Sequence, residues 1–248
     1  MTLLKRMFSA RWLLTTLFVF AGAALCVRLG IWQLDRLQQR RAFNSHYLQA
    51  RAEPPLDINA SLPESLANAE YRDAVVRGKY DFEHQVALRN QYNGSDFGYH
   101  LLTPLMLNDH LAILVDRGWI PAEGNDSPSG WQRYDAPGEV SLRGMLRLTE
   151  LKPAFGGVAD PTLEPGQARL DLWNNVNLER IGAQLPYKLL DAYLQPVPDP
   201  GDTTPPIPFQ PEIEISEGPH LGYAGQWFIF AALLFFGYPL FYLRKQAG

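Results

Sequence analysis

The sequence predicts a membrane protein in which two transmembrane helices flank an extracytoplasmic, β-rich domain with minor helices. One apolar span lies near each end of the chain, at residues 12–32 and 220–243. The polar body between them carries many short strand-like segments punctuated by Gly and Pro, which is typical of an antiparallel sheet or a barrel. The predicted parts are a cytoplasmic tail (1–11), the first span (12–32), the β-rich domain (33–195), a Pro-rich connector (196–219), the second span (220–243) and a second cytoplasmic tail (244–248).

The first span is short between its flanking arginines, because a membrane helix needs about 20 apolar residues. Arg28 can extend its side chain towards the lipid headgroups, so that the span continues to Trp32. The alternative is a cleaved signal peptide with its cleavage site at residues 21–23. A lipoprotein signal is disfavoured because Leu25, and not a small residue, precedes Cys26. We expect a membrane helix.

The second span has no charged residue between Leu221 and Leu243. Its apolar residues cover every face of the predicted helix, which is long enough to cross a bilayer with some tilt. Aromatic residues stand at both ends, as in the interfacial belts of membrane proteins. They are Tyr223, Trp227, Tyr238 and Tyr242.

Lysine and arginine placement predicts that both termini are cytoplasmic, and two spans then place the middle domain outside the cytoplasm. Basic residues stand before the first span and after the second, at Lys5, Arg6, Arg11, Arg244 and Lys245. Arg36, Arg40 and Arg41 just beyond the first span oppose this orientation. The second span decides the orientation. Only one positive charge, Lys188, lies between Gln184 and His220, whereas two follow the span directly.

The polar body is expected to begin with a helical continuation of the first span, Gln33–Gln49, that Pro54 and Pro55 end. Five further segments follow in order: a strand pair within Tyr71–Asn90, a hairpin of Tyr99–Leu107 and Leu111–Trp119 around Asn108-Asp109, a half-buried strand Val140–Leu148, a short helix Leu178–Gln184 and a strand Tyr187–Val197.

The connector holds eight of the 20 prolines in the chain. Such density favours an extended segment that crosses the domain surface and returns to the membrane. A disordered linker is the alternative.

Composition excludes several classes of function. A net charge of -4 without a basic face argues against a nucleic-acid partner. The single cysteine, Cys26, lies in the first span, so the polar body has no disulfide, iron–sulfur cluster, cysteine zinc site or thiol nucleophile. No Gly-rich nucleotide loop, serine elbow or His-Glu-x-x-His motif is present. The chain is therefore not expected to be an enzyme, and a membrane-anchored periplasmic enzyme is the least favoured hypothesis.

His220 is the strongest candidate for a site residue, because neutral imidazole coordinates iron well and costs little at a membrane interface. Trp227 follows about two helical turns later on nearly the same face. It could stack on a porphyrin or anchor the helix at the interface. The other polar candidates are expected to be structural or solvated: His84, His100, His110, Glu212, Glu214, Glu217 and Arg117, the last in a salt bridge or paired with a propionate.

An ordered set of short motifs resembles the Surfeit-locus (Surf1-like) family of cytochrome c oxidase assembly factors, in its bacterial branch. The set covers essentially the whole chain, including both spans. Its runs are Leu29–Arg36, Tyr71-Arg72, Val76–Tyr80, Gly98-Tyr99, Thr103–Leu105, Val115–Pro121, Gly144–Arg147, His220–Ala224 and Gln226-Trp227.

This resemblance implies a haem chaperone that handles haem a during its insertion into the main subunit of cytochrome c oxidase. Haem a synthase and membrane lipid are further implied partners. The family's haem-contacting histidine and tryptophan carry over to His220, as the ligand of the haem iron, and Trp227. The resemblance also implies an inner-membrane location with the middle domain periplasmic. A separate hypothesis, not implied by the family, is that Arg117 or the Arg36 region meets the propionates. The alternative is an assembly scaffold that holds the oxidase subunit without touching haem.

The chain departs from the family pattern at two positions. Gly218 stands where the family often has Asn, which could alter how His220 is presented. Asn177 stands where an acidic residue is common, which is expected to exchange one helix cap for another.

Overall fold

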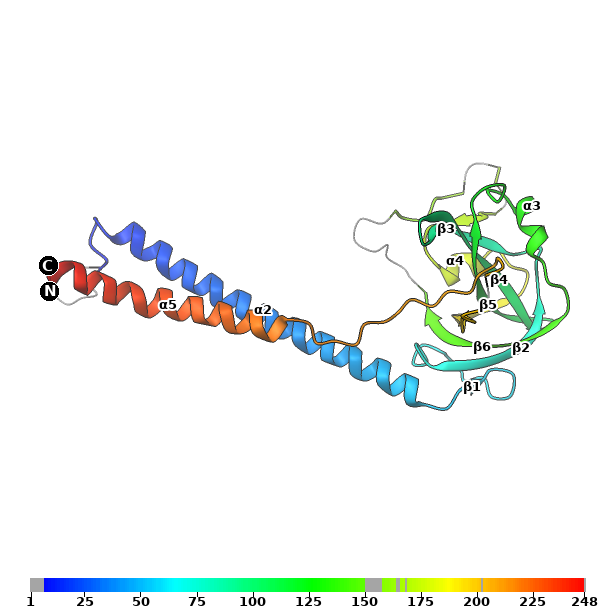
Figure 1. The fold of residues 1–248 in the computed structure, drawn as a ribbon, viewed down its shortest axis with the longest axis horizontal. Helices are drawn as coiled ribbons and strands as arrows, with labels where there is room; N and C mark the ends of the chain where they lie inside the picture. The colour runs from blue at the N-terminus through cyan, green and yellow to red at the C-terminus, as the bar shows by residue number, and fades with distance from the viewer. Residues whose placement is uncertain (1–6, 150–157, 164–165, 168, 202, 248) are drawn as a thin grey trace. The chain divides into compact units, whose positions relative to one another are not determined.

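The computed structural model describes residues 7–149, 158–163, 166–167, 169–201 and 203–247 (Figure 1). The chain divides into two units, which are described separately. One unit combines Met1–His46 with Glu214–Gly248, and the other is Tyr47–Ile213. Lys5 and Arg6, two of the charges that predict the orientation, lie outside the described residues, as does the side chain of Lys245.

The first unit is a pair of helices that lie side by side and run in opposite directions (Figure 1). Helix α2 (Leu13–Ala52) is continuous over 40 residues, which joins the predicted span to its predicted helical continuation. It ends before Pro54, because proline disfavours a helical conformation in the residue before it. Helix α5 (His220–Ala247) forms the second predicted span. Both helices are long and apolar enough to cross a membrane.

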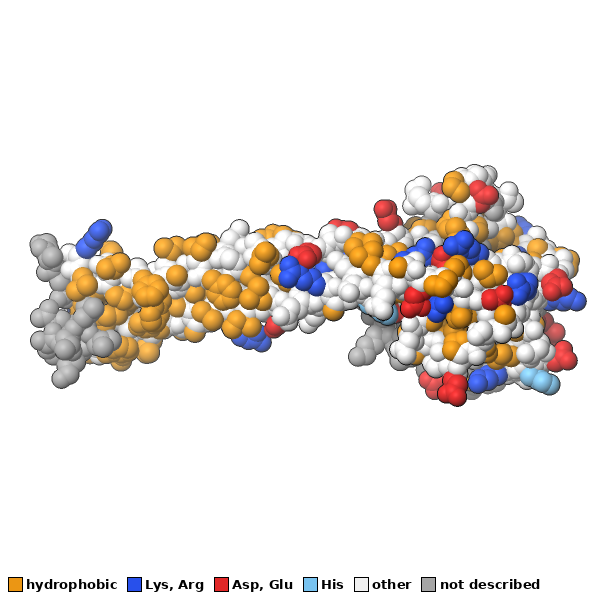
Figure 2. Space-filling model, turned by 90° about the horizontal axis from the view of Figure 1, so that it is seen from below, with side chains coloured by type: hydrophobic (Ala, Val, Ile, Leu, Met, Phe, Trp, Pro, Cys, Tyr) orange, Lys and Arg blue, Asp and Glu red, His pale blue; other side chains and the backbone are white. Residues whose placement is uncertain are grey.

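Small residues and polar pairs hold the two helices together. A Cβ atom at Gly30 would lie 2.7 Å from the ring of Phe228, so a larger residue would force this ring to move. Nearer the termini, the hydroxyl groups of Thr16 and Tyr238 are 2.8 Å apart. Exposed hydrophobic side chains gather along the two predicted spans, as a lipid environment requires (Figure 2).

The second unit is a β-rich, barrel-like domain, as predicted. The strands follow the order β1-β2-β6-β8-β5-β4-β3-β7, and an additional pairing of β2 with β4 closes a ring of β2, β6, β8, β5 and β4. Within the ring the pairs are antiparallel except for β5 and β8, which are parallel. The elements are β1 (Leu56–Asp57), β2 (Asp73–Tyr80), β3 (Val86–Asn93), β4 (Asp96–Asn108), β5 (Leu111–Pro121), α3 (Pro128–Trp131), the 3-10 helix η1 (Gln132–Tyr134), β6 (Glu139–Leu148), β7 (Leu172–Trp173), α4 (Leu178–Gly182) and β8 (Lys188–Pro196).

The predicted strand pair within Tyr71–Asn90 is wrong in its pairing. Strands β2 and β3 form, but each pairs with β4. Asp81 explains this: its carboxylate accepts hydrogen bonds from the amides of Glu83 (3.1 Å) and His84 (3.3 Å), and its own amide donates to Pro104 of β4 (2.9 Å). This turn keeps the chain on one edge of β4 instead of folding it back on itself. The predicted β4–β5 hairpin is confirmed.

The hydrophobic core occupies the barrel interior and two flanking clusters. Inside the barrel, all five ring strands contribute fully buried residues, among them Val76, Leu105, Ile113, Leu146 and Leu194. The flanking clusters centre on Trp173, packed with α4, and on Trp131. Helix α4 begins with the expected cap, since the Asn177 side chain accepts a hydrogen bond from the amide of Arg180 (3.1 Å).

The connector is held on the domain as an extended segment. Ile207 exchanges two backbone hydrogen bonds with Trp119 of β5, of 2.8 and 2.9 Å. Further along, the Gln210 amide donates to the carbonyl of Gln195 in β8 (2.6 Å). The connector therefore adds a short strand-like contact to β5 beyond the end of β8.

Candidate functional site

His220 is the first residue of α5, and its imidazole contacts Gln33 of α2. The distance from His220 Nδ1 to Gln33 Oε1 is 2.8 Å, and both side chains are half-buried. An amide oxygen can only accept a hydrogen bond, so Nδ1 carries the proton and donates it. In the neutral imidazole, the other ring nitrogen, Nε2, then has the lone pair, and this is the form that binds a metal.

Gly218 shapes the approach to this imidazole. Its φ of +64° lies in the left-handed region, which Gly adopts at no steric cost and Asn more readily than other residues. The departure from the family's Asn thus preserves the backbone conformation. A Cβ atom at this position would lie 3.4 Å from Cδ2 and 3.5 Å from Nε2 of His220. Glycine therefore places no side chain of its own against that edge of the ring.

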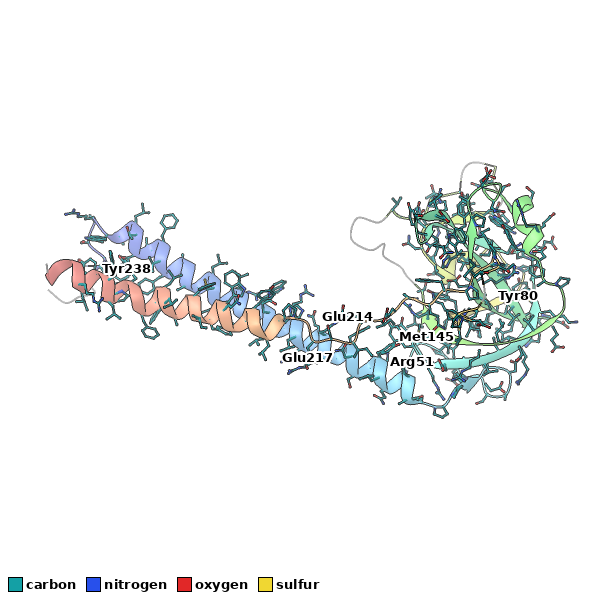
Figure 3. The ribbon with its side chains drawn as sticks, in the orientation of Figure 1. Arg51, Tyr80, Met145, Glu214, Glu217 and Tyr238 are labelled. Atoms are coloured by element: carbon teal, nitrogen blue, oxygen red, sulfur yellow. The ribbon has the colours of Figure 1, made fainter. Side chains whose placement is uncertain are left out.

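The chain segment that leads into α5 is anchored to α2 through its main chain. The Arg40 guanidinium donates to the carbonyl of Glu214 (2.7 Å) and to that of Ser216 (2.9 Å), and Asn44 donates to the latter at 3.2 Å. The position of Glu214 beside α2 can be followed in Figure 3. These contacts fix where α5 begins. They therefore also fix the position of His220 along the α2 axis, next to Gln33.

An ion pair lies beside this anchor. Arg41 and Glu217 form two hydrogen bonds of 2.7 and 2.9 Å, with both side chains about half exposed (54% and 50%) (Figure 3). The hydrogen bond from Arg41 lowers the pKa of the Glu217 carboxyl. The sequence predicts Glu217 on a solvated face, and it is exposed there but also paired. An exposed pair of this kind adds little stability.

Trp227 lies on the same face of α5 as His220, about 10 Å further along the helix axis. Its indole is half-buried and packs edge-to-face against Phe230, with ring centroids 6.0 Å apart and planes at 81°. The structure therefore places the two predicted site residues on one face without bringing them into contact in the described part of the chain.

Comparisons with known proteins assign the chain to a family. The model of the SURF1 family matches residues 20–232, a range that begins within the first span, ends within the second and includes the barrel, Gln33 and His220. The chain belongs to the SURF1 family. The resemblance found in the sequence motifs is therefore confirmed, including its bacterial branch.

The relatives in the SURF1 family are distant in sequence. Mouse Surfeit locus protein 1 is 28% identical over 153 residues, an alignment that covers 56% of this chain and 49% of the mouse protein, so about half of that protein's length is spanned. A SURF1-like protein of Mycobacterium tuberculosis is 28% identical over 228 residues, 90% of this chain and 80% of that protein. A Caenorhabditis elegans SURF1-like protein is 27% identical over 246 residues, 89% of this chain and 71% of that protein.

Arg117, in one of the motifs that this SURF1-family chain carries, is buried in the barrel domain. Its guanidinium lies 5.1 Å from the ring centroids of both Tyr80 and Phe82 and donates to the Tyr134 carbonyl. Burial lowers its pKa. The expected salt bridge is absent from the ion pairs of the described residues, and cation–π contacts take its place. A buried group of this kind is not placed to meet a propionate.

Arg36 differs from Arg117 in being exposed. It lies over the Trp32 ring at 5.5 Å and donates to Gln39 at 2.8 Å, and it is one helical turn from Gln33. Of the two arginines predicted to meet propionates, the geometry favours Arg36.

The three histidines of the barrel domain that the sequence singled out are paired with a carboxylate or exposed. His84 pairs with Asp81 (2.7 Å), the buried His100 pairs with Asp116 (3.1 Å), and His110 is exposed in the β4–β5 turn. No group of three or more His, Cys, Asp or Glu side chains that could hold a metal ion occurs among the residues that the structure describes. His220 is thus a lone donor, which suits an iron already held by a porphyrin better than a bare ion.

Sequence reasoning missed Gln33, Arg40 and Asn44 as parts of the site. Gln33 stands in a family motif, but its role depends on a partner 187 residues away. In the sequence, Arg40 stands out only as a positive charge beyond the first span. A polar residue at the end of an apolar span was the one local signal that could have pointed to Gln33.

Proposed function

We propose that this chain is an assembly factor for cytochrome c oxidase that binds haem a transiently through His220 and aids its insertion into the main oxidase subunit. SURF1-family proteins are generally oxidase assembly factors. The observation that carries the haem part is the bond from His220 Nδ1 to Gln33, which leaves Nε2 free at the entrance of a membrane-spanning helix. A role in assembly calls for no catalytic group.

The donor set fits a single protein ligand to a haem iron. Haem supplies an iron centre that accepts a neutral imidazole nitrogen. His220 Nε2 would hold the iron, Gly218 places no side chain against that edge of the ring, and Trp227 offers an aromatic surface further down the same face. A single protein ligand binds less tightly than a pair, which suits a carrier that must give up its cargo.

A propionate would be met by Arg36. Its guanidinium is exposed and lies one turn from Gln33, where a charge-assisted hydrogen bond to a carboxylate can form. Arg117 is left out of this role because it is enclosed by Tyr80 and Phe82.

The proposed location is the inner membrane, with both termini cytoplasmic and the barrel domain periplasmic. Arg11 and Arg244 agree with the positive-inside rule. Arg40 and Arg41 would add positive charge on the periplasmic side, against this rule. Both, however, bind the segment that leads into α5, which supports a structural reason for their presence. The main oxidase subunit and haem a synthase would then be reached within the same membrane.

The test of haem binding is an absorption spectrum of the full chain purified in detergent after co-expression with haem a synthesis. We expect a stoichiometric haem band in the wild type, its loss in His220→Ala and its retention in His110→Ala, a control that removes an exposed histidine of the barrel domain. A band of equal size and position in His220→Ala would exclude His220 as the ligand.

A second measurement distinguishes a haem carrier from a scaffold. Cells that lack the chain are complemented with wild type or His220→Ala, and assembled oxidase is measured. A carrier predicts little assembled oxidase with His220→Ala. Full assembly with a variant that binds no haem would favour a scaffold that holds the oxidase subunit without touching haem.

A further inference from the structure

We infer that Gln33 is a positioning residue that fixes the tautomer of His220 and thereby sets how strongly this histidine binds iron. The inference rests on the proposed function and adds to it a residue of the other helix. The contact from His220 Nδ1 to Gln33 Oε1, at 2.8 Å, is a side-chain hydrogen bond between α2 and α5.

The chemistry of the two groups gives the contact its direction. A neutral imidazole has one protonated and one bare nitrogen, and only the bare one coordinates. Without an acceptor at Nδ1, the proton can occupy Nε2, the nitrogen that would face the iron. The carbonyl oxygen of Gln33 stabilises only the tautomer with the proton on Nδ1.

The packing around the pair fixes its geometry from both sides. One turn before Gln33, the contact between Gly30 and Phe228 fixes the separation of the two helices. Two turns after Gln33, Arg40 holds the main chain of Glu214 and Ser216. The imidazole is therefore ordered before any ligand arrives, which reduces the entropy lost on binding.

The choice of an amide also sets the strength of the bond. A carboxylate accepts a stronger, charge-assisted hydrogen bond and makes the imidazole a more basic ligand. An amide carbonyl orients the ring but leaves the imidazole a less basic, and therefore weaker, ligand for the iron. This matches a carrier that must bind haem and then release it.

The first test needs no haem. In full-length chain with 15N-labelled histidine, NMR reports which nitrogen of His220 is protonated, with His220→Ala identifying the signal. We expect the Nδ1–H form in wild type and in Gln33→Glu, and a loss of this preference in Gln33→Met, which keeps the length of the side chain without an acceptor. Gln38→Met, at an exposed position of the same helix, is the matched control. An unchanged tautomer in Gln33→Met would overturn the inference.

The second test uses haem a as the probe. Gln33→Met should weaken haem binding by about 10- to 100-fold, the usual cost of losing an outer-shell partner of a metal ligand. Gln33→Glu should bind at least as tightly as wild type. The reduction potentials of the bound haem should rise in the order Gln33→Glu, wild type, Gln33→Met, because a more basic ligand favours the ferric state.

The outcomes separate the two proposals. If Gln33→Met binds haem with the affinity and potential of the wild type, Gln33 has no positioning role, while the proposed function stands. If neither wild type nor Gln33→Glu binds haem, the proposed haem-binding function and the ligand role of His220 fail. The NMR measurement then still tests whether Gln33 fixes the tautomer of His220.

Discussion

Gly118 lies where the connector meets β5, and its backbone has a φ of +112°. A Cβ atom there would lie 2.1 Å from the carbonyl oxygen of Ile207, whose hydrogen bonds to Trp119 hold the connector. Gly118→Ala should therefore break this contact. We expect a loss of about 1–3 kcal/mol in unfolding free energy, and faster proteolysis within residues 203–210. Chemical denaturation and limited proteolysis measure the two effects.

Gly138→Ala is the control for this substitution. Gly138 has a similar φ of +127°, but nothing lies within 4 Å of the position of an added Cβ. Gly138→Ala should lower the unfolding free energy only by the strain of placing alanine at a positive φ. The connector should remain protected from proteolysis. Equal proteolysis of the two variants would mean that the Ile207 contact does not hold the connector.

Single residues differ in how much of their role can be predicted from sequence. A histidine at the mouth of an apolar span is conspicuous, so the sequence alone points to His220. It does not point to Gln33, because the partner of this residue belongs to the far end of the chain. A salt bridge is the sequence-based expectation for Arg117, since an arginine at a strand end usually has an acidic partner. Its setting against two neighbouring aromatic rings depends on the barrel closing around it.

Helices and strands could be predicted where the segment is long enough for its apolar residues to show a helical or strand-like spacing. The continuous α2, the β4–β5 hairpin and the strands β6 and β8 follow from such patterns. The two-residue strands β1 and β7 are too short to show one. Which strands pair is decided by long-range contacts, as in β2 and β3, which both join β4. The parallel β5–β8 pair likewise depends on where the intervening chain travels.

The start of α5 depends on one arginine of α2. Arg40→Met removes the donors to the carbonyls of Glu214 and Ser216, so the segment before His220 should loosen. We expect hydrogen exchange of the amides in residues 216–223 to become severalfold faster. Arg36→Met is the matched control, because Arg36 bonds to Gln39 of its own helix. Equal exchange in the two variants would contradict the anchoring role of Arg40.

Acid should weaken the neighbouring ion pair. The pKa of Glu217 is lowered by Arg41, so the contribution of the pair is fully present above the ordinary glutamate value, about 4.3, and is lost as the pH falls through the lowered value. Because both side chains are exposed, Glu217→Gln should change exchange at residues 216–223 less than Arg40→Met does, and high salt should reduce its effect further.

At the scale of the whole chain, the two helices constrain the topology. If both α2 and α5 cross the membrane, the two termini lie on one side and the barrel domain between them on the other. We expect a cysteine introduced as Ser95→Cys, in the exposed β3–β4 turn, to react with an impermeant maleimide while the inner membrane is intact. Cys26→Ala provides the background, because Cys26 is the one native thiol. A cysteine appended at the C-terminus should react only after that membrane is permeabilised. The reverse labelling pattern would place the barrel domain in the cytoplasm. Labelling of both cysteines with the membrane intact would mean that α5, the helix between them, does not cross.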